Sequence, residues 1–187
     1  MSGADKGVEI TLAGLEAQAD QPGRYWLYMQ DGQGRIMALS IAQHNARLMA
    51  LHRLGLGEGF YSLHRSFLDL LTLGPWRLQQ CRIGMDSRQK VVAWLHLRGP
   101  EGPRELSMAP SDGIWTALQQ QVPVYTSVQF FEQHAVSGLP EAMGGPADPH
   151  AYTLAALQQL EQYYLHREDY EEAARVRLLM ARKRGQV

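Results

Sequence analysis

The polar side chains best suited to chemistry gather at residues 110–112, which read Pro-Ser-Asp. Pro110 fixes a backbone angle that suits the first turn of a helix, and either Ser111 or Asp112 can offer an oxygen to the unpaired amides of that turn. The Asp112 carboxylate also suits the positive end of the helix dipole. Because a carboxylate is equally a ligand for a divalent cation, capping and metal binding both stay open for Asp112.

The residues around this tripeptide predict a strand, a helix, a second strand and a second helix between positions 107 and 135. Ile114 and Leu118 recur at the spacing of one helix face. A short apolar strand is expected at residues 124–126, and Ser127 is placed to cap the helix that follows. We expect the preceding residues to form the scaffold that positions this segment.

This stretch resembles the closing segment of the bifunctional nuclease family. The family signature reads Asp-x-Arg-Pro-Ser-Asp-Ala-Ile, and a strand similar to Pro-Ile-Tyr-Val follows it. The matching residues here are Ser107, Ala109, Pro110, Ser111, Asp112, Gly113 and Ile114, then Val122, Pro123, Val124 and Tyr125. The turn is kept, but Ser107 stands at the family's first Asp position and Ala109 at its Arg position.

Two earlier segments show the same partial resemblance. Residues 37–42 (MALSIA) match a family strand that an acidic residue follows, but here Gln43 comes next. The family's Thr-His-Asp-Leu helix start is matched by Ser62, Leu63 and His64. His64 is therefore a candidate functional histidine, although a single histidine at a helix start is also common as a structural or solvated residue.

The resemblance implies metal-dependent cleavage of DNA or RNA, with Mg²⁺ or Mn²⁺ as the cofactor. It assigns Asp112, Ser111 and His64 as candidate catalytic residues, with Asp112 as the metal ligand. Such chemistry needs carboxylates that hold a cation against the scissile phosphate. Asp69 and Asp86 are the other candidates, but no pair of carboxylates has metal-ligand spacing. We therefore expect cleavage to be weak, or the chain to be a catalytically degenerate adaptor.

The remaining pattern predicts an α+β fold with a mixed β-sheet core and packed helices. Glycine alternates at residues 55–59 (GLGEG), but no Lys-Ser/Thr follows, so this run is read as a connection and not a phosphate loop. Asp31-Gly32-Gln33-Gly34 is a hairpin turn signal. Strands are expected at 8–12, 24–29, 35–40, 76–83, 90–98 and 104–108, and helices at 41–54 and 63–73.

The last fifty residues are organised differently. Gly and Pro are concentrated at residues 137–149, which predicts a linker between a domain at 1–136 and a helical hairpin at 150–187. Residues 167–177 (REDYEEAARVR) resemble the UVR motif, a helical hairpin named from nucleotide-excision-repair proteins. A two-helix unit cannot bury its apolar stripe alone, so we expect the hairpin to bind a protein partner, with folding back onto its own core as the alternative.

Charge and composition limit the classes of partner that are expected. Net charge is −1, so bulk charge does not favour nucleic-acid binding, although Arg24, Arg35, Arg82, Arg88 and Arg98 can assemble a local basic surface. Cys81 is the single cysteine and is expected to be buried and inert. No apolar run approaches the roughly 20 residues that span a bilayer, and the start of the chain lacks signal-peptide features. We expect a cytoplasmic homo-oligomer, such as a dimer, without membrane contact.

Overall fold

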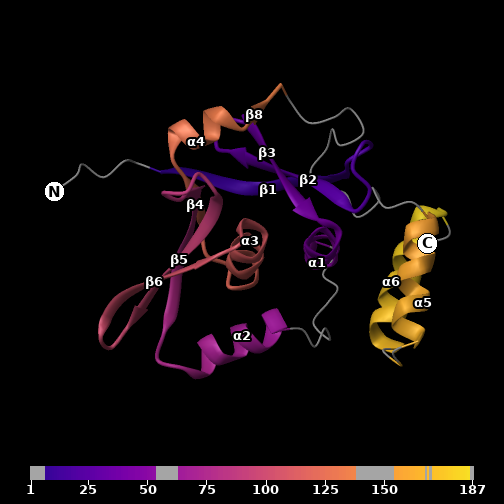
Figure 1. Ribbon diagram of the computed structural model, residues 1–187. Helices are drawn as coiled ribbons and strands as arrows, with labels where there is room; N and C mark the ends of the chain where they lie inside the picture. The colour runs from indigo at the N-terminus through magenta and orange to yellow at the C-terminus, as the bar shows by residue number, and fades with distance from the viewer. Residues whose placement is uncertain (1–6, 54–62, 138–153, 167, 169, 186–187) are drawn as a thin grey trace.

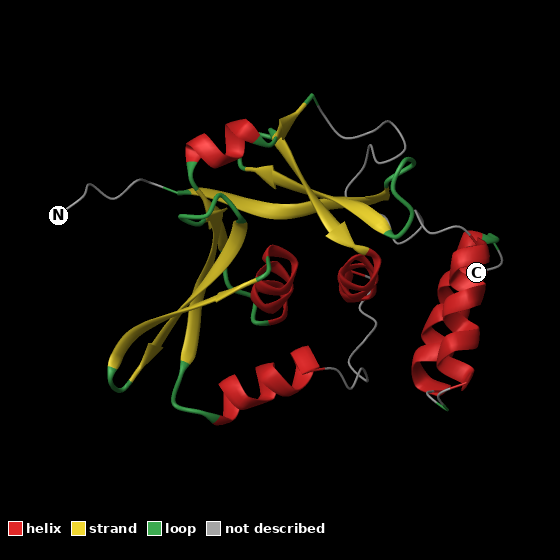
Figure 2. Ribbon diagram, viewed as in Figure 1, coloured by secondary structure: helices red, strands yellow, loops and turns green. Residues whose placement is uncertain are grey.

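The computed structural model describes residues 7–53, 63–137, 154–166, 168 and 170–185. Within these residues the chain forms one sheet of eight strands, with six helices (Figures 1 and 2). The strands are β1 (Val8–Ala17), β2 (Arg24–Asp31), β3 (Ile36–Ala42), β4 (Arg77–Met85), β5 (Val91–Gly99), β6 (Gly102–Met108), β7 (Val124–Thr126) and β8 (Ala135–Val136). The helices are α1 (Gln43–Arg53), α2 (Leu63–Leu73), α3 (Pro110–Gln119), α4 (Val128–Gln133), α5 (Leu154–His166) and α6 (Tyr170–Lys183).

The sheet is assembled from two antiparallel halves that meet at β7. The strand order is β6-β5-β4-β7-β1-β2-β3-β8, and β7 pairs parallel with β4 but antiparallel with β1. All other neighbours are antiparallel. The α+β fold with a mixed sheet is therefore confirmed. Three residues of β7 tie the halves together, and buried Thr126 donates a hydrogen bond to the Ile83 carbonyl at 2.9 Å.

The sheet bends around α1 and α3, which lie inside the bend (Figure 2). α3 packs on β4 and β5 at very short range because its fourth residue, Gly113, has no side chain. A Cβ at Gly113 would lie 2.3 Å from the Ala93 Cβ and 3.2 Å from the Cys81 Sγ. Cys81 is fully buried here, and burial raises the pKa of its thiol to about 12. The expectation of a buried cysteine is confirmed.

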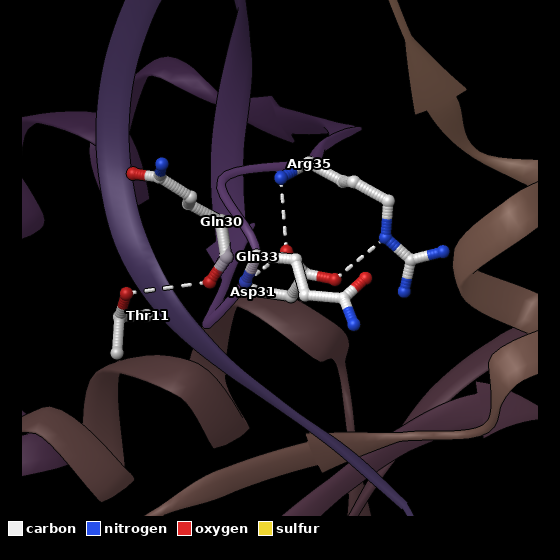
Figure 3. A network of polar contacts seen from close by, with 5 residues as sticks. All are labelled: Thr11, Gln30, Asp31, Gln33 and Arg35. Carbon is white, nitrogen blue, oxygen red and sulfur yellow. Dashed lines mark hydrogen bonds and ion pairs between the residues drawn. The ribbon is translucent and has the colours of Figure 1, made fainter.

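The turn between β2 and β3 is held by one carboxylate (Figure 3). Asp31 accepts hydrogen bonds at 2.9 Å from the backbone amides of Gln33 and Arg35, and one at 2.8 Å from the Arg35 Nε. Gly34 has a φ of +83°, which glycine adopts readily, and the predicted hairpin turn is confirmed. Burial opposes ionisation of Asp31, but the hydrogen bonds and charge supplied by this turn outweigh it and lower the pKa of the carboxyl group.

The two C-terminal helices pack on each other as the predicted hairpin. Their shared interior is apolar, and Leu157 and Tyr164 of α5 meet Ala173, Val176 and Met180 of α6. The sequence pattern predicts that Tyr170, Ala173, Ala174 and Met180 form one face that needs cover, and this prediction is wrong in part. Ala173 and Met180 are buried against α5, whereas Tyr170 and Ala174 are exposed.

Several boundaries differ from the expected ones. β1 extends to Ala17, five residues beyond the prediction, because a register shift between Leu12 and Gly14 lets the strand stay paired with β2. The glycine-rich run at 55–59 and the linker at 137–149 lie wholly or almost wholly outside the described residues. The domain division therefore stays a prediction. No helix within the described ranges is long and apolar enough to cross a membrane.

Candidate functional site

The Pro-Ser-Asp turn begins α3 as expected, but not by the expected cap. Ala109 is the N-cap residue and makes no side-chain capping bond, and Pro110 occupies the start of the first turn. Neither Ser111 nor Asp112 therefore acts as the N-cap, because both already lie inside the helix. The capping interpretation is wrong. The Asp112 carboxylate lies in the first turn, where the helix dipole favours a negative charge.

Both polar side chains are instead turned toward α1. The Asn45 Nδ2 donates a hydrogen bond to the Ser111 Oγ at 2.6 Å and another to the Asp112 Oδ1 at 3.2 Å. Ser111 is buried and Asp112 is half-buried. Asn45, Ser111 and Asp112, which we call the amide cluster, thus join residues 66 positions apart in the chain.

A second contact joins the same two helices seven residues further along each. The His52 Nδ1 lies 2.8 Å from the Gln119 Nε2, and the His52 ring meets the Trp115 ring edge-on at 5.5 Å. Burial lowers the pKa of His52, so the imidazole is neutral at physiological pH. Two turns of helix separate it from Asn45, a rise of about 10 Å, so His52 and the amide cluster form separate contacts.

A divalent ion finds an incomplete set of ligands at the amide cluster. Asp112 supplies a carboxylate and Ser111 a hydroxyl, but Asn45 directs an N–H donor at both oxygens. Throughout the described ranges, no three His, Cys, Asp or Glu side chains lie close enough to hold a metal. The Asp86 carboxylate accepts backbone hydrogen bonds from Arg88 and Lys90 in the β4–β5 turn. These residues do not fit a resident metal ion.

The other predicted site residues are not brought to this cluster by any observed contact. His64 is the second residue of α2, and its side chain lies outside what the structure describes. Arg24 donates hydrogen bonds to Ser40, and Arg35 is held by Asp31. Of the five arginines, Arg35 is therefore neutralised by a carboxylate, and a basic surface that includes the others stays a prediction.

Asn45 and His52 were not singled out from the sequence. Both lie in the predicted helix at 41–54, where neither an asparagine nor a histidine stands out by type. The available signal was spacing, because the two residues are seven apart and so share a helix face. That face is the one that meets α3.

Comparison of the chain with protein-family models and with curated proteins gives no match. The resemblance to bifunctional nucleases therefore rests on the signature residues around Asp112. The resemblance to the UVR motif rests on residues 167–177. Function follows from these residues and their geometry as a proposal.

Proposed function

We propose that this chain is a protein of the bifunctional nuclease type, with weak metal-dependent cleavage of DNA or RNA. The amide cluster carries the proposal, because it brings the signature residues Ser111 and Asp112 together with a polar group of another helix. Asp112 is half-buried at a helix start, where negative charge is stabilised. The proposal includes the cytoplasmic location expected from the sequence.

The cleavage is weak because Asp112 is the single acidic side chain of the cluster. Mg²⁺ keeps several waters and is commonly held by one or two carboxylates together with substrate phosphates. An ion at Asp112 would therefore have to arrive with the nucleic acid. Asn45 would hold the Asp112 carboxylate in position through its hydrogen bond to the Oδ1. Ser111 would hold Asn45 by accepting its other hydrogen bond.

The first prediction concerns the metal. Single-stranded and duplex DNA and RNA, incubated with the purified protein, should be cleaved slowly with Mg²⁺ or Mn²⁺. Cleavage should fall to background in excess chelator, because the protein alone does not complete the ion's coordination. Substrate incubated with the same buffers without protein is the control. Undiminished cleavage in chelator would contradict the proposed chemistry.

A second candidate function is favoured by the surface of α6. Tyr170, Ala174 and Leu178 are exposed and follow one another at intervals of four residues, which places them in one row on the helix. The Tyr170 and Leu178 side chains are 65% and 56% exposed. Together with the resemblance to the UVR motif, this row supports an adaptor that docks a repair or regulatory protein, or a second copy of the chain, through its hairpin.

Charge next to the row can select the partner. Arg177 is exposed and forms an ion pair with Glu161 of α5 at 2.7 Å, so its position is fixed by the hairpin itself. Charges at the rim of an apolar contact influence specificity and association rate more than affinity. We therefore expect the apolar row to supply the affinity and the surrounding charges to discriminate among partners.

The second prediction tests this row with Ala174→Glu. A buried unpaired carboxylate is strongly unfavourable, so the variant should lose its partner or dissociate to monomers, with affinity reduced about ten-fold or more. Light scattering and pull-down from lysate measure the two outcomes. Gln158→Glu, which adds the same charge at an exposed position of α5, is the matched control. An Ala174→Glu protein with unchanged mass and partners would exclude the row as an interface.

A further inference from the structure

The sheet has a second face that the amide cluster does not use. Ala93 of β5 lies under Gly113 of α3, so the next residue, Trp94, points to the opposite side of the sheet. We call this side of β4, β5 and β7 the outer face. Trp94 is only half-buried there, whereas Ala93 and Leu95 on the α3 side are fully buried.

The strand register places an aromatic and cationic row across the outer face. Trp94 of β5 pairs with Arg82 of β4, and Arg82 in turn pairs with Tyr125 of β7. Directly paired residues of neighbouring strands point to the same side, so the three side chains lie next to one another. Gly84 is the neighbour of Arg82 on this side of β4, and the Trp94 ring lies 3.1 Å from the position of its missing Cβ. The absent side chain gives the indole room to extend over β4.

The charge of the outer face favours an anion. Arg82 and Arg98 are exposed, and neither has an ion-pair partner in the described part of the chain. Arg98 is also paired directly with Arg77, whose guanidinium donates hydrogen bonds to the Gly74 and Trp76 carbonyls. Glu9 and Glu105 flank the row on β1 and β6, so three arginines face two glutamates. Arg82 lies between Trp94 and Tyr125, Arg77 and Arg98 lie at the far ends of β4 and β5, and Glu9 is paired with Tyr125 at one end of the row.

We propose that the outer face binds single-stranded DNA or RNA. Unpaired bases would stack on Trp94 and Tyr125, and Arg82 between them would contact the phosphate backbone. A sheet face with aromatic side chains beside arginine is a general solution for unpaired nucleic acid, because every base offers a flat face. A duplex hides those faces. This inference rests on the proposed nuclease function and names its substrate class, but binding at Trp94 requires neither Asp112 nor a metal ion.

The test is binding without cleavage. Fluorescein-labelled oligo(dT) and oligo(U) of about 20 nucleotides, a length that covers several stacking sites, would be titrated in excess chelator and followed by anisotropy. Trp94→Leu should weaken binding roughly ten-fold, and Trp94→Phe should recover most of the loss. Arg82→Gln should weaken binding. It should also reduce the slope of log affinity against log salt concentration by about one, which corresponds to the loss of one phosphate contact. Arg104 of β6 pairs with Leu97 and so lies on the α3 side of the sheet, opposite the outer face. Arg104→Gln should therefore bind like the parent.

The possible results separate the outer-face inference from the proposed nuclease function. Unchanged binding by both Trp94→Leu and Arg82→Gln, or no binding by the parent chain, overturns the outer-face inference. So does a change of oligomeric state in these variants without a change in affinity, because the face would then join copies of the chain. Loss of binding in the face variants of a parent that does not cleave supports the inference and contradicts the nuclease function. Arg82→Gln alters an exposed side chain, so its result does not depend on how Trp94→Leu folds.

Discussion

Gly113→Ala is expected to lower the free energy of unfolding by about 2 kcal/mol, although alanine is the better helix former. The added methyl group would lie 2.3 Å from the Ala93 Cβ, far inside the 3.5–4.0 Å of a normal carbon contact. Helix propensity returns at most about 1 kcal/mol, and overpacking costs roughly 1–3 kcal/mol. The clash is with a strand whose side chain cannot rotate away, so α3 must shift. Urea unfolding measures the loss.

The control moves the methyl group without changing the number of carbons at the contact. In Gly113→Ala/Ala93→Gly the helix carries the methyl group and the strand does not, so the double variant should be clearly more stable than the sum of the single changes predicts. Additive losses would show that α3 and β5 are not in close contact. A neutral Gly113→Ala would have the same meaning.

Gly113 also shows where the sequence was informative and where it was not. The position carries alanine in the family signature that residues 107–114 resemble, and nothing in the local pattern explains the glycine. The reason is Ala93, which stands on another element and cannot be seen in a window around α3. Close approach between distant elements is a tertiary property, and local patterns carry no record of it.

Elements bounded by strong stop signals were predicted well. α2 and β7 have the predicted limits, because Gly74-Pro75 ends the first and Pro123 and Ser127 bracket the second. Ser127 caps α4 as predicted, by accepting a hydrogen bond from the Phe130 amide. β1 lacked such a signal at its end, and its last five residues were missed.

The candidate site was predicted by residue type but not by partner. Ser111 and Asp112 were assigned from the signature, whereas Asn45 became visible only when α1 was placed beside α3. The same holds for the outer face. Trp94, Arg82 and Tyr125 are spread over more than forty positions, and only the strand register brings them into one row.

The placement of Asn45 leads to the prediction for Asp112. Asp112→Asn should reduce cleavage to background, because it removes the one carboxylate of the amide cluster while keeping its shape. Stability should change by less than about 1 kcal/mol, since Asp112 is not the N-cap and only its favourable charge at the helix start is lost. Cleavage with Mn²⁺ and thermal unfolding measure the two effects. Asp20→Asn, at an exposed loop position, is the control for removal of a carboxylate elsewhere.

Asn45→Asp makes the complementary change. The Asn45 side chain lies 3.2 Å from the Asp112 Oδ1, so an aspartate there would set two carboxylates against each other. Without a cation their repulsion should destabilise the fold, and Mn²⁺ should raise the unfolding temperature of this variant more than that of the parent, together with faster cleavage. If Asp112→Asn cleaves like the parent, and Mn²⁺ leaves Asn45→Asp unaffected, the amide cluster is a structural contact between α1 and α3. The adaptor function would then be favoured.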